Sequence, residues 1–230
     1  MGTPAPRYAI YFLPGEGSAL ARFGARWFGY DCLAGHACRR ESFGLGDLAT
    51  RAVEGPARYG FHATLVAPFH LRPPVTIDDV LERLHAVAVS RRAPEPPLLS
   101  MHELGGFLAL RPGDDLPLRR LAVACLFACN PLRAELSKAE RDRRLRSPLT
   151  PYQRILMKAY GYPYVMDEYR FHITLTGKLE EMERKYIESA LAEVLSPILV
   201  QPVPIDAISL LEQTTPDAPF RFHSRVQLSA

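Results

Sequence analysis

One short string occurs twice in this chain, and the repeat constrains the fold more than any other feature. The first copy is YGFHATL at residues 59–65, the second is YRFHITL at residues 169–175, and five of the seven positions are identical. The two histidines, His62 and His172, are 110 residues apart. This is the spacing of two halves of a domain, because the repeats of solenoids and propellers are much shorter. We therefore expect two similar halves that build one site.

Each copy has the pattern of a strand with two different faces. Side chains alternate along a strand, so His62 and Thr64 share one face and the apolar residues around them share the other. A regular second strand would carry on its polar face Arg170, His172, Thr174, Thr176 and Lys178. We expect the apolar faces to pack against helices and the polar faces to border a ligand, with most of the positive charge coming from the second copy.

The segments around the first copy predict the elements of half a domain. Residues 7–13 are aromatic and β-branched and stop at a Pro-Gly pair, which indicates a strand near the centre of a sheet. Residues 20–27 predict a helix among glycine-rich loops. Thr76 is a candidate N-cap, with Asp79 three residues later and apolar residues at helical spacing beyond. Gly105-Gly106 lies between two apolar runs and predicts a hairpin.

The same order of elements recurs after the second copy. A helix is predicted from about residue 182 to 195, followed by strands at 205–212 and 220–228. Tandem units of strand, helix and two strands favour an α+β fold in which helices cover one face of each sheet. Two such sheets can face each other across a cleft.

The segment between the two halves predicts further helices. Residues 116–130 form an apolar helix in which Cys125 and Cys129 share a buried face. Residues 133–146 hold six basic residues interleaved with acidic ones, which is typical of a solvated helix face; a phosphate-collecting patch is the alternative. The aromatic residues from Tyr160 to Tyr164, together with Thr150-Pro151, are interpreted as a loop ahead of the second copy.

Composition and charge limit the classes of partner. Of the 230 residues, 47% are hydrophobic and 23% are charged, and the formal net charge is +3. This charge is too small to favour a long RNA footprint, although it suits a small anion. No apolar run approaches the ~18 residues of a membrane span, and residues 1–13 lack the pattern of a signal peptide. We expect a cytoplasmic protein with neither a membrane nor an obligate protein partner.

Two sets of residues could in principle hold a metal ion, but neither has a familiar spacing. The first set is Cys32, His36 and Cys38. The second is His62 and His172 with Asp167 or Glu168, as in a metal hydrolase. The four cysteines are also too irregularly spaced for a disulfide framework. We therefore expect reduced thiols, no metal and no cofactor.

Two histidines that converge on one phosphate can divide the work of acid and base, because imidazole titrates near neutral pH. One would deprotonate a water or a ribose hydroxyl, and the other would protonate the departing oxygen. Thr64 and Thr174 would hold the non-bridging oxygens, with positive charge from Lys178 and Arg170. Further candidate substrate contacts are Tyr11, Tyr59, Tyr169 and Thr176. The residues alone do not fix which histidine is the acid, and a non-catalytic nucleotide or RNA-end binder would use almost the same set.

These motifs resemble the signature of the two-histidine (2H) phosphoesterase superfamily, which has two His-x-Thr/Ser motifs in tandem lobes. The matching residues are His62-Ala63-Thr64 and His172-Ile173-Thr174. Longer strings look like a bacterial branch often encoded with phosphonate-utilisation (carbon-phosphorus lyase) genes. They are RYGFHATL at 58–65, GYPY at 161–164 and YRFHITLTGK at 169–178. The likeness extends over most of the chain.

The resemblance implies a single bilobal domain over residues 1–230, with two pseudo-symmetric antiparallel sheets lining a central cleft and helices on the outside. The implied parts are motif-bearing halves at approximately 50–112 and 150–230, a helical connecting segment at 113–149, and a strand at 7–13 that pairs into one of the sheets.

The resemblance also implies metal-independent cleavage of a phosphodiester, typically cyclic, with His62 and His172 as the catalytic pair and Thr64 and Thr174 binding phosphate. For this branch the implied substrate is a small sugar cyclic phosphate, such as a 5-phosphoribosyl 1,2-cyclic phosphate. Other members of the superfamily process 2′,3′-cyclic or 2′-5′ RNA ends, for which the aromatic residues at 160–164 could stack a base.

Overall fold

A seven-stranded antiparallel sheet runs through the molecule in the order β5-β6-β7-β4-β1-β8-β9, beside a two-stranded sheet of β2 and β3. This computed structural model describes residues 5–146 and 148–229. The strands are β1 (Arg7–Phe12), β2 (Tyr30–Asp31), β3 (His36–Ala37), β4 (Ala63–Phe69), β5 (Leu99–Leu104), β6 (Phe107–Pro112), β7 (Ile173–Thr174), β8 (Ala207–Gln213) and β9 (Arg221–Gln227).

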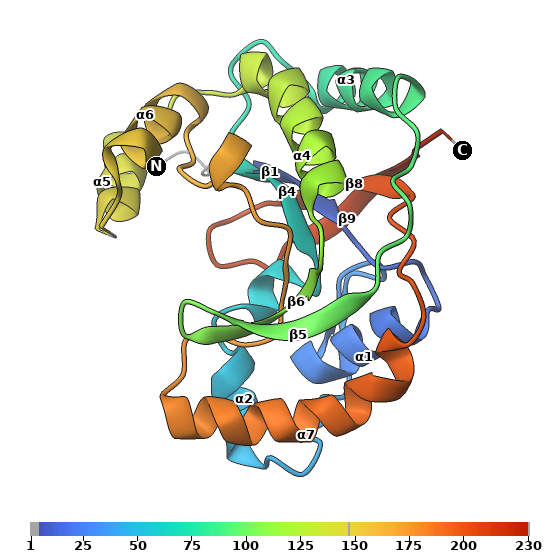
Figure 1. The fold of residues 1–230 in the computed structure, drawn as a ribbon. Helices are drawn as coiled ribbons and strands as arrows, with labels where there is room; N and C mark the ends of the chain where they lie inside the picture. The colour runs from blue at the N-terminus through green and yellow to red at the C-terminus, as the bar shows by residue number, and fades with distance from the viewer. Residues whose placement is uncertain (1–4, 147, 230) are drawn as a thin grey trace.

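Helices cover the two ends of this sheet. They are α1 (Ala19–Phe28), α2 (Asp47–Val53), α3 (Ile77–Val89), α4 (Leu116–Cys129), α5 (Lys138–Leu145), α6 (Pro151–Tyr160) and α7 (Glu181–Leu199). Helix α4 packs on β4 and α3 packs on β8 and β9, whereas α7 packs on β5 and β6. Figure 1 shows the resulting arrangement, with α3 and α4 at one end and α1, α2 and α7 at the other.

The order of elements in both halves agrees with the order expected from the sequence, and the α+β class is confirmed. Strand β1 lies between β4 and β8, well inside the sheet. Helix α3 begins with the predicted capping box of Thr76 and Asp79. Cys125 and Cys129 are buried on α4, as expected. The apolar residues of both motifs are buried too, and none of Phe61, Ala63, Leu65, Phe171, Ile173 and Leu175 is more than 5% exposed.

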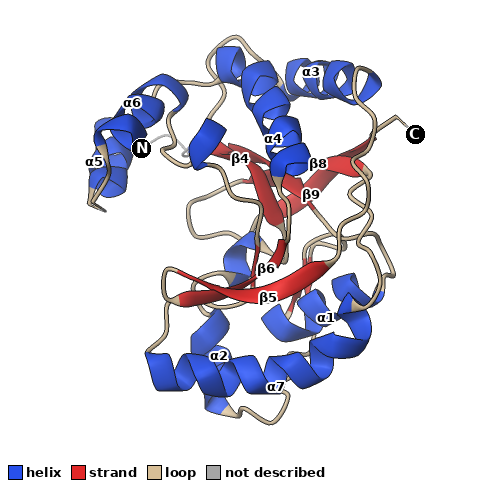
Figure 2. Cartoon of the chain, in the orientation of Figure 1, coloured by secondary structure: helices blue, strands red, loops and turns tan. Residues whose placement is uncertain are grey.

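The expectation of two separate sheets was wrong for the described residues, because the two motif strands pair with each other. Strand β4 pairs antiparallel with β7, with Ala63 opposite Ile173. This pairing joins the strands of both halves into one sheet. Figure 2 still shows two groups of strands, β4, β8 and β9 near α3 and α4, and β5 and β6 near α1, α2 and α7.

The motif strands themselves differ from the prediction in length. The first begins at Ala63 rather than at Phe61 and continues through Phe69. The second comprises only Ile173–Thr174. It stops there because the backbone N–H groups of Leu175 and Thr176 both donate to the carbonyl of Leu108, at 2.8 and 3.3 Å. Two residues of one strand thus lie opposite a single residue of its neighbour, which is the geometry of a β-bulge. The bulge interrupts the alternation of side chains between the two faces of the sheet.

Helix α6 lies where the sequence was interpreted as part of a loop. Thr150 and Gln153 form a capping box at its start, and Gly161 ends it with a left-handed backbone, φ 69°. Arg133 and Arg144 donate to the carbonyls of Ala159 and Gly161 at the end of the same helix. Cations at a helix C-terminus are favourable because they complement the helix dipole.

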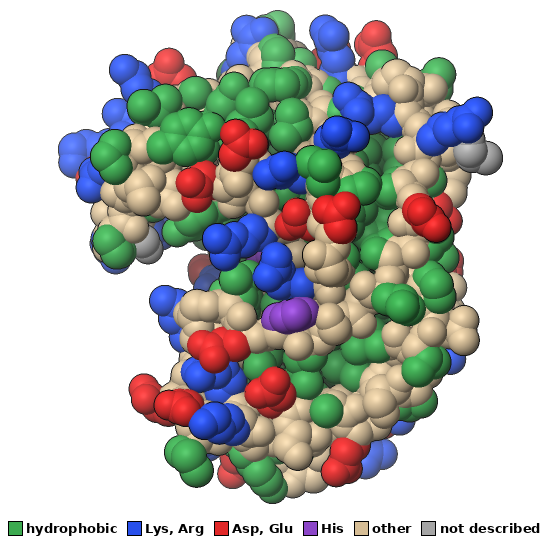
Figure 3. Space-filling view, in the orientation of Figure 1, with side chains coloured by type: hydrophobic (Ala, Val, Ile, Leu, Met, Phe, Trp, Pro, Cys, Tyr) green, Lys and Arg blue, Asp and Glu red, His purple; other side chains and the backbone are tan. Residues whose placement is uncertain are grey.

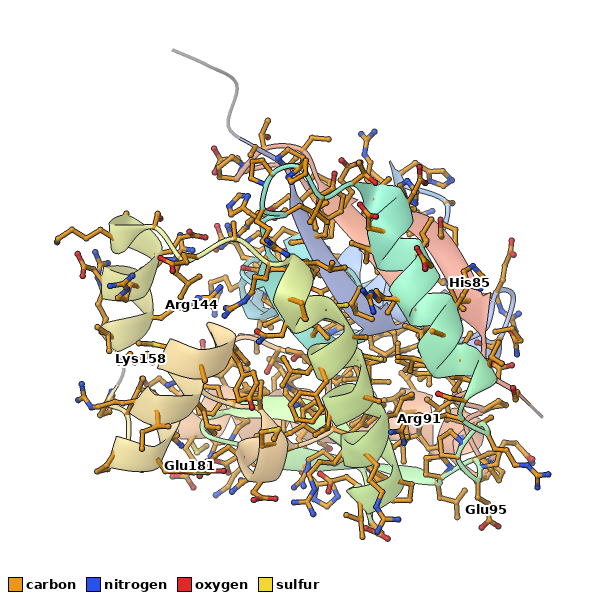
Figure 4. All side chains as sticks on the ribbon, turned by 90° about the horizontal axis from the view of Figure 1, so that it is seen from above. His85, Arg91, Glu95, Arg144, Lys158 and Glu181 are labelled. Atoms are coloured by element: carbon orange, nitrogen blue, oxygen red, sulfur yellow. The ribbon has the colours of Figure 1, made fainter. Side chains whose placement is uncertain are left out.

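Most of the arginine-rich segment is exposed, as expected for a solvated helix face, but Arg144 is an exception. Its guanidinium also donates to the carbonyl of Pro68 at 3.3 Å and lies 5.7 Å from the centre of the Tyr162 ring. Figure 4 labels Arg144 on the side of α5 that faces the rest of the molecule. Burial lowers the pKa of Arg144. This side chain therefore anchors α5 to the sheet and to α6.

Candidate active site

The pairing of the motif strands brings the two His-x-Thr motifs together. Ala63 and Ile173 are direct partners in an antiparallel pair. Continuing this register by one residue in each direction sets His62 opposite Thr174 and Thr64 opposite His172. Ala63 and Ile173 are fully buried, so the four polar side chains share the opposite face of the sheet. Each histidine thus faces the threonine of the other motif, at the ~5 Å separation between Cβ atoms of such pairs.

The same local hydrogen bond orients both imidazole rings. Nδ1 of His62 lies 2.9 Å from the carbonyl oxygen of Gly60, and Nδ1 of His172 lies 2.8 Å from that of Arg170. A carbonyl only accepts, so Nδ1 carries the proton in both rings and Nε2 is left as the acceptor. The Thr64 hydroxyl donates to Nε2 of His62 across 3.1 Å. Both rings can therefore take up a proton on Nε2.

The two copies differ at the residue that provides this carbonyl. Gly60 has a left-handed backbone with φ 73°, and a Cβ there would lie 2.7 Å from Cβ of Cys32. Glycine is required at this buried position for both reasons. Arg170 occupies the equivalent position in the second copy and is exposed. The first motif is consequently buried against Cys32 at this position, whereas the second motif borders solvent there.

Burial lowers the pKa of both histidines. It lowers the pKa of His62 to about 4, against the opposing effect of the bond to Gly60, and the neighbouring His172 lowers it further. Burial also lowers the pKa of His172, against the bond to Arg170, and the charge of Arg111 adds to the lowering. The two rings are therefore close enough for their charges to interact. A ligand that brought negative charge would raise both pKa values.

Aromatic rings support the two imidazoles. The ring of Tyr11 stacks on His62 with centroids 3.7 Å apart and planes at 20°. Tyr11 is only 1% exposed, so it positions His62 from beneath rather than offering a surface to a substrate. Tyr59 lies 6.4 Å from His62 and stacks on Phe220. Phe107 lies 5.9 Å from His172.

A cavity of about 490 Å³ opens beside His172. The predicted site residues that line it are Thr64, Tyr169, Arg170, His172 and Lys178. Aromatic side chains from Phe107, Tyr162 and Tyr164 form other parts of its wall. His62 and Thr174 lie outside this lining. Figure 3 shows a hollow in this face of the molecule, with Lys, Arg and His side chains at its edge.

Two of the candidate substrate contacts hydrogen bond to backbone groups of the protein. Thr176 was expected on the open face, but the bulge turns it inward, where it is 1% exposed and its hydroxyl accepts from the N–H of Leu108 at 3.0 Å. The hydroxyl of Tyr169 donates to the backbone carbonyl of Thr64 at 3.0 Å. Tyr169 therefore links the second motif to the first, although part of it still borders the cavity.

Sequence reasoning missed Arg111, which reaches this site from β6. Strand β6 pairs with β7, with Leu110 opposite Ile173, so the next residue along β6 lies opposite His172. Alternation identifies 107–111 as a strand, but no local pattern shows which strand it pairs with. Gln153 and Glu168 hydrogen bond to each other at 2.8 Å in the cavity wall; the sequence did not suggest Gln153, and it suggested Glu168 only as a metal ligand.

Within residues 5–146 and 148–229, no three His, Cys, Asp or Glu side chains are arranged to hold a metal ion. Cys32 is buried, with its thiol donating to the carbonyl of Phe220 at 3.6 Å, and His36 is exposed. The described part of the chain also contains no helix that is both long and apolar enough to cross a membrane.

The fold and the site define an α+β protein with two histidine motifs paired at the middle of one sheet. The chain belongs to the family described as protein of unknown function DUF1045, whose model matches residues 64–221. The matched region contains Thr64 and the whole second motif, and it starts two residues after His62.

Two curated relatives carry the name ribose 1,5-bisphosphate phosphokinase PhnN. The protein from Janthinobacterium sp. (strain Marseille) is 31% identical over 230 residues, which cover 97% of this chain and 51% of the relative. The protein from Laribacter hongkongensis (strain HLHK9) is 33% identical over 216 residues, which cover 94% of this chain and 50% of the relative. This chain thus spans about half the length of the curated relatives it matches.

Among solved structures, a crystal structure of the conserved protein of unknown function ATU0111 from Agrobacterium tumefaciens str. C58 aligns with 96% of this chain and 85% of that chain. The sequence identity is 13% and the TM-score is 0.40. A likeness at this score carries no argument about function.

Proposed function

We propose that this chain is a phosphoesterase that hydrolyses a phosphodiester, cyclic in the favoured case, of a small sugar phosphate or nucleotide. The observation that carries the proposal is the antiparallel pairing of Ala63 with Ile173. This pairing sets each motif's histidine opposite the other motif's threonine on one face. Such a quartet offers two proton-transfer groups and two hydroxyl donors to one phosphate group.

In the proposed reaction, a water molecule attacks phosphorus and the bond from phosphorus to the leaving oxygen breaks. One histidine takes the water proton on Nε2, and the other gives its Nε2 proton to the leaving oxygen. The Thr64 hydroxyl turns from Nε2 of His62 to a non-bridging oxygen when the substrate binds, which frees Nε2 to accept the proton. The Thr174 hydroxyl donates to a second non-bridging oxygen, and both donors stabilise the charge that builds up in the transition state. Arg170 and Lys178 at the cavity edge add positive potential.

We assign His62 as the general base and His172 as the general acid. His62, with a pKa of about 4, is neutral over the physiological range and is held rigidly against Tyr11. His172 lines the open cavity, where a bound phosphate would raise its pKa and load it with a proton. The leaving group would then depart toward the cavity.

The size and the lining of the cavity favour a compact substrate. About 490 Å³ is in the range of pockets for small ligands, and the aromatic wall can pack against a sugar or a base. The relatives' name refers to a doubly phosphorylated ribose. A ribose cyclic phosphate that arises in phosphonate breakdown is consistent with both, and processing of a 2′,3′-cyclic RNA end is the alternative within this reaction class.

The kinase name of the relatives favours a second candidate, phosphoryl transfer from a nucleotide. The present sequence contains no GxxxxGK[ST] motif, whose loop holds nucleotide phosphates in many kinases. Because the chain spans only about half of each relative, we assign the phosphokinase activity to the other half of those proteins.

Turnover of a panel of cyclic sugar phosphates and 2′,3′-cyclic nucleotides, with EDTA present, tests the proposal. We expect His62→Ala and His172→Ala each to lower kcat by about 10²–10⁴-fold, the usual contribution of one general acid or base. His85→Ala is the matched control, because His85 is exposed on α3 (Figure 4), away from both motifs. Binding of these compounds without turnover would show that the protein is a non-catalytic binder. Loss of activity with EDTA would refute the metal-free mechanism.

A further inference from the structure

Arg111 lies next to His172 on the polar face of the sheet. Strand β6 pairs with β7, with Ala109 opposite Thr174 and Leu110 opposite Ile173. The next pair in this register is Arg111 and His172. Leu110 is fully buried in the core, so alternation along β6 directs Arg111 to the face that carries the two motifs.

Two further observations place Arg111 at the histidine. The charge of Arg111 contributes to the lowered pKa of His172, in agreement with this register. Phe107, four residues earlier on β6 and therefore on the same face, has its ring centre 5.9 Å from that of His172. The segment from Phe107 to Arg111 thus forms one side of the site.

The guanidinium of Arg111 differs from those of Arg184 and Arg225, which are also half-buried but form ion pairs. Its Nε atom is buried and has no hydrogen-bond partner, and no ion pair in the described part of the chain includes Arg111. By contrast, Arg184 pairs with Glu103 at 3.0 Å and Arg225 with Asp206 at 3.1 Å. Burying a donor of a cation without a partner is costly, and a bound anion would compensate for this cost.

We propose that Arg111 is a substrate-binding residue whose guanidinium holds the phosphate group between His62 and His172. The planar fork of arginine can donate two parallel hydrogen bonds to two phosphate oxygens. The nature of the ligand, a phosphate ester, rests on the proposed function, whereas the anion site itself rests on the geometry of β6 and β7.

The position of Arg111 also changes which residue we expect to supply most of the positive charge at the phosphate. The sequence suggested Arg170 and Lys178, but both are exposed, and solvent and salt screen exposed charges. Arg111 is half-buried beside His172, at the β6 side of the quartet, where its field is less screened by solvent. Arg111 therefore binds the phosphate directly, whereas the exposed Arg170 and Lys178 add only long-range attraction.

The test compares Arg111→Met, Arg111→Lys and the control Arg120→Met, which removes an exposed arginine from α4. We expect Arg111→Met to lower kcat/KM by about 10²–10³-fold, the effect of removing one transition-state donor. Arg111→Lys should lower kcat/KM less than Arg111→Met does, because lysine keeps the positive charge but lacks the planar guanidinium. Arg120→Met should retain wild-type activity, and circular dichroism should show that all three variants fold.

A second readout does not depend on turnover. NMR titration of the imidazole nitrogens should give a higher pKa for His172 in Arg111→Met than in the wild type, because a neighbouring positive charge is gone. Inorganic phosphate should raise the pKa of His172 in the wild type and should do so much less in Arg111→Met.

The outcomes separate this inference from the proposed function. Phosphate binding that depends on Arg111, without turnover of any ester, would support the anion site and refute the phosphoesterase. Ester turnover that is within twofold of wild type in Arg111→Met, with an unchanged His172 titration, would overturn the inference and leave the phosphoesterase intact. A wild-type protein whose His172 does not respond to phosphate would also overturn it.

Discussion

At the scale of single residues, the same tripeptide pattern has two different environments. The ring of His62 stacks on Tyr11, whereas His172 lines the cavity together with Arg170. The copies also differ two residues before each histidine, where Gly60 packs against Cys32 and Arg170 is exposed. In the reaction proposed above, these environments suit the two histidines to different steps.

The assignment of base and acid predicts different responses to the leaving group. A nitrophenolate departs without protonation, so a nitrophenyl phosphodiester does not need the general acid. His172→Ala should therefore lose at least ten times less activity on such an ester than on one with an alkoxide leaving group. His62→Ala should lose about the same on both, and equal losses for His172→Ala would contradict the assignment. Steady-state kinetics on the two esters provides the measurement.

The lowered pKa of His62 also predicts that stability depends on pH. Desolvation lowers this pKa from its ordinary value of 6.5 to about 4 in the native state. Between these values the unfolded chain binds a proton that the native state does not, so the free energy of unfolding falls as pH falls from 6.5 toward 4. One such group gives a slope of at most about 1.4 kcal/mol per pH unit.

Replacing His62 by glutamine should remove this contribution and leave a smaller slope from His172, whose pKa is also lowered. Urea unfolding at several pH values between about 4 and 6.5 measures this dependence of the free energy of unfolding on pH. Identical slopes for wild type and His62→Gln would mean that His62 is not held neutral in the native state.

At the scale of elements, a bulge determines the shape of the second motif strand. Leu175 and Thr176 share the carbonyl of Leu108, and the indole of Trp27 donates to the carbonyl of Leu175 at 2.7 Å. These bonds end β7 after Thr174 and turn Thr176 into the interior. The residue that a regular strand would present to the ligand instead holds two strands together.

The two threonines should therefore respond differently to the same change. Thr176→Val leaves the buried N–H of Leu108 without its side-chain acceptor and should cost about 1–3 kcal/mol of stability. Thr174→Val should cost little stability but should lower kcat. Chemical unfolding and kinetics on both variants measure these effects. A stable Thr176→Val protein with a large loss of kcat would instead indicate that Thr176 contacts the substrate.

At the scale of the whole molecule, one sheet connects the two halves and positions the site at their junction. The connection is the pairing of β4 with β7, with β1 and β6 on either side. Because each half provides one histidine and one threonine, neither half alone would hold the complete quartet.

The relation to the longer relatives predicts a division of activities. The chain alone should hydrolyse a phosphodiester and should fail to transfer phosphate from ATP to ribose 1,5-bisphosphate. Coupled assays for ADP formation and for ester cleavage, on this chain and on a full-length relative, measure both activities. ATP-dependent kinase activity in this chain alone would contradict the division.

The sequence by itself determined the local features of this protein. The repeat identified the two motif strands and their buried residues, and Thr76 with Asp79 marked the start of α3, because alternation and capping depend only on nearby residues. Helix α6 was missed because its aromatic residues suggested a loop, although Thr150 with Gln153 is a local capping signal.

Only the tertiary structure decided which strands meet. The pairing of Ala63 with Ile173, the position of Arg111 opposite His172, and the burial of Tyr11 and Thr176 all depend on register between segments that are distant in sequence. Register is set by packing across the whole sheet, and a shift of one residue would turn every side chain to the other face. The sequence thus provided the two histidines, and the fold brought them together beside a cavity and placed Arg111 on the neighbouring strand.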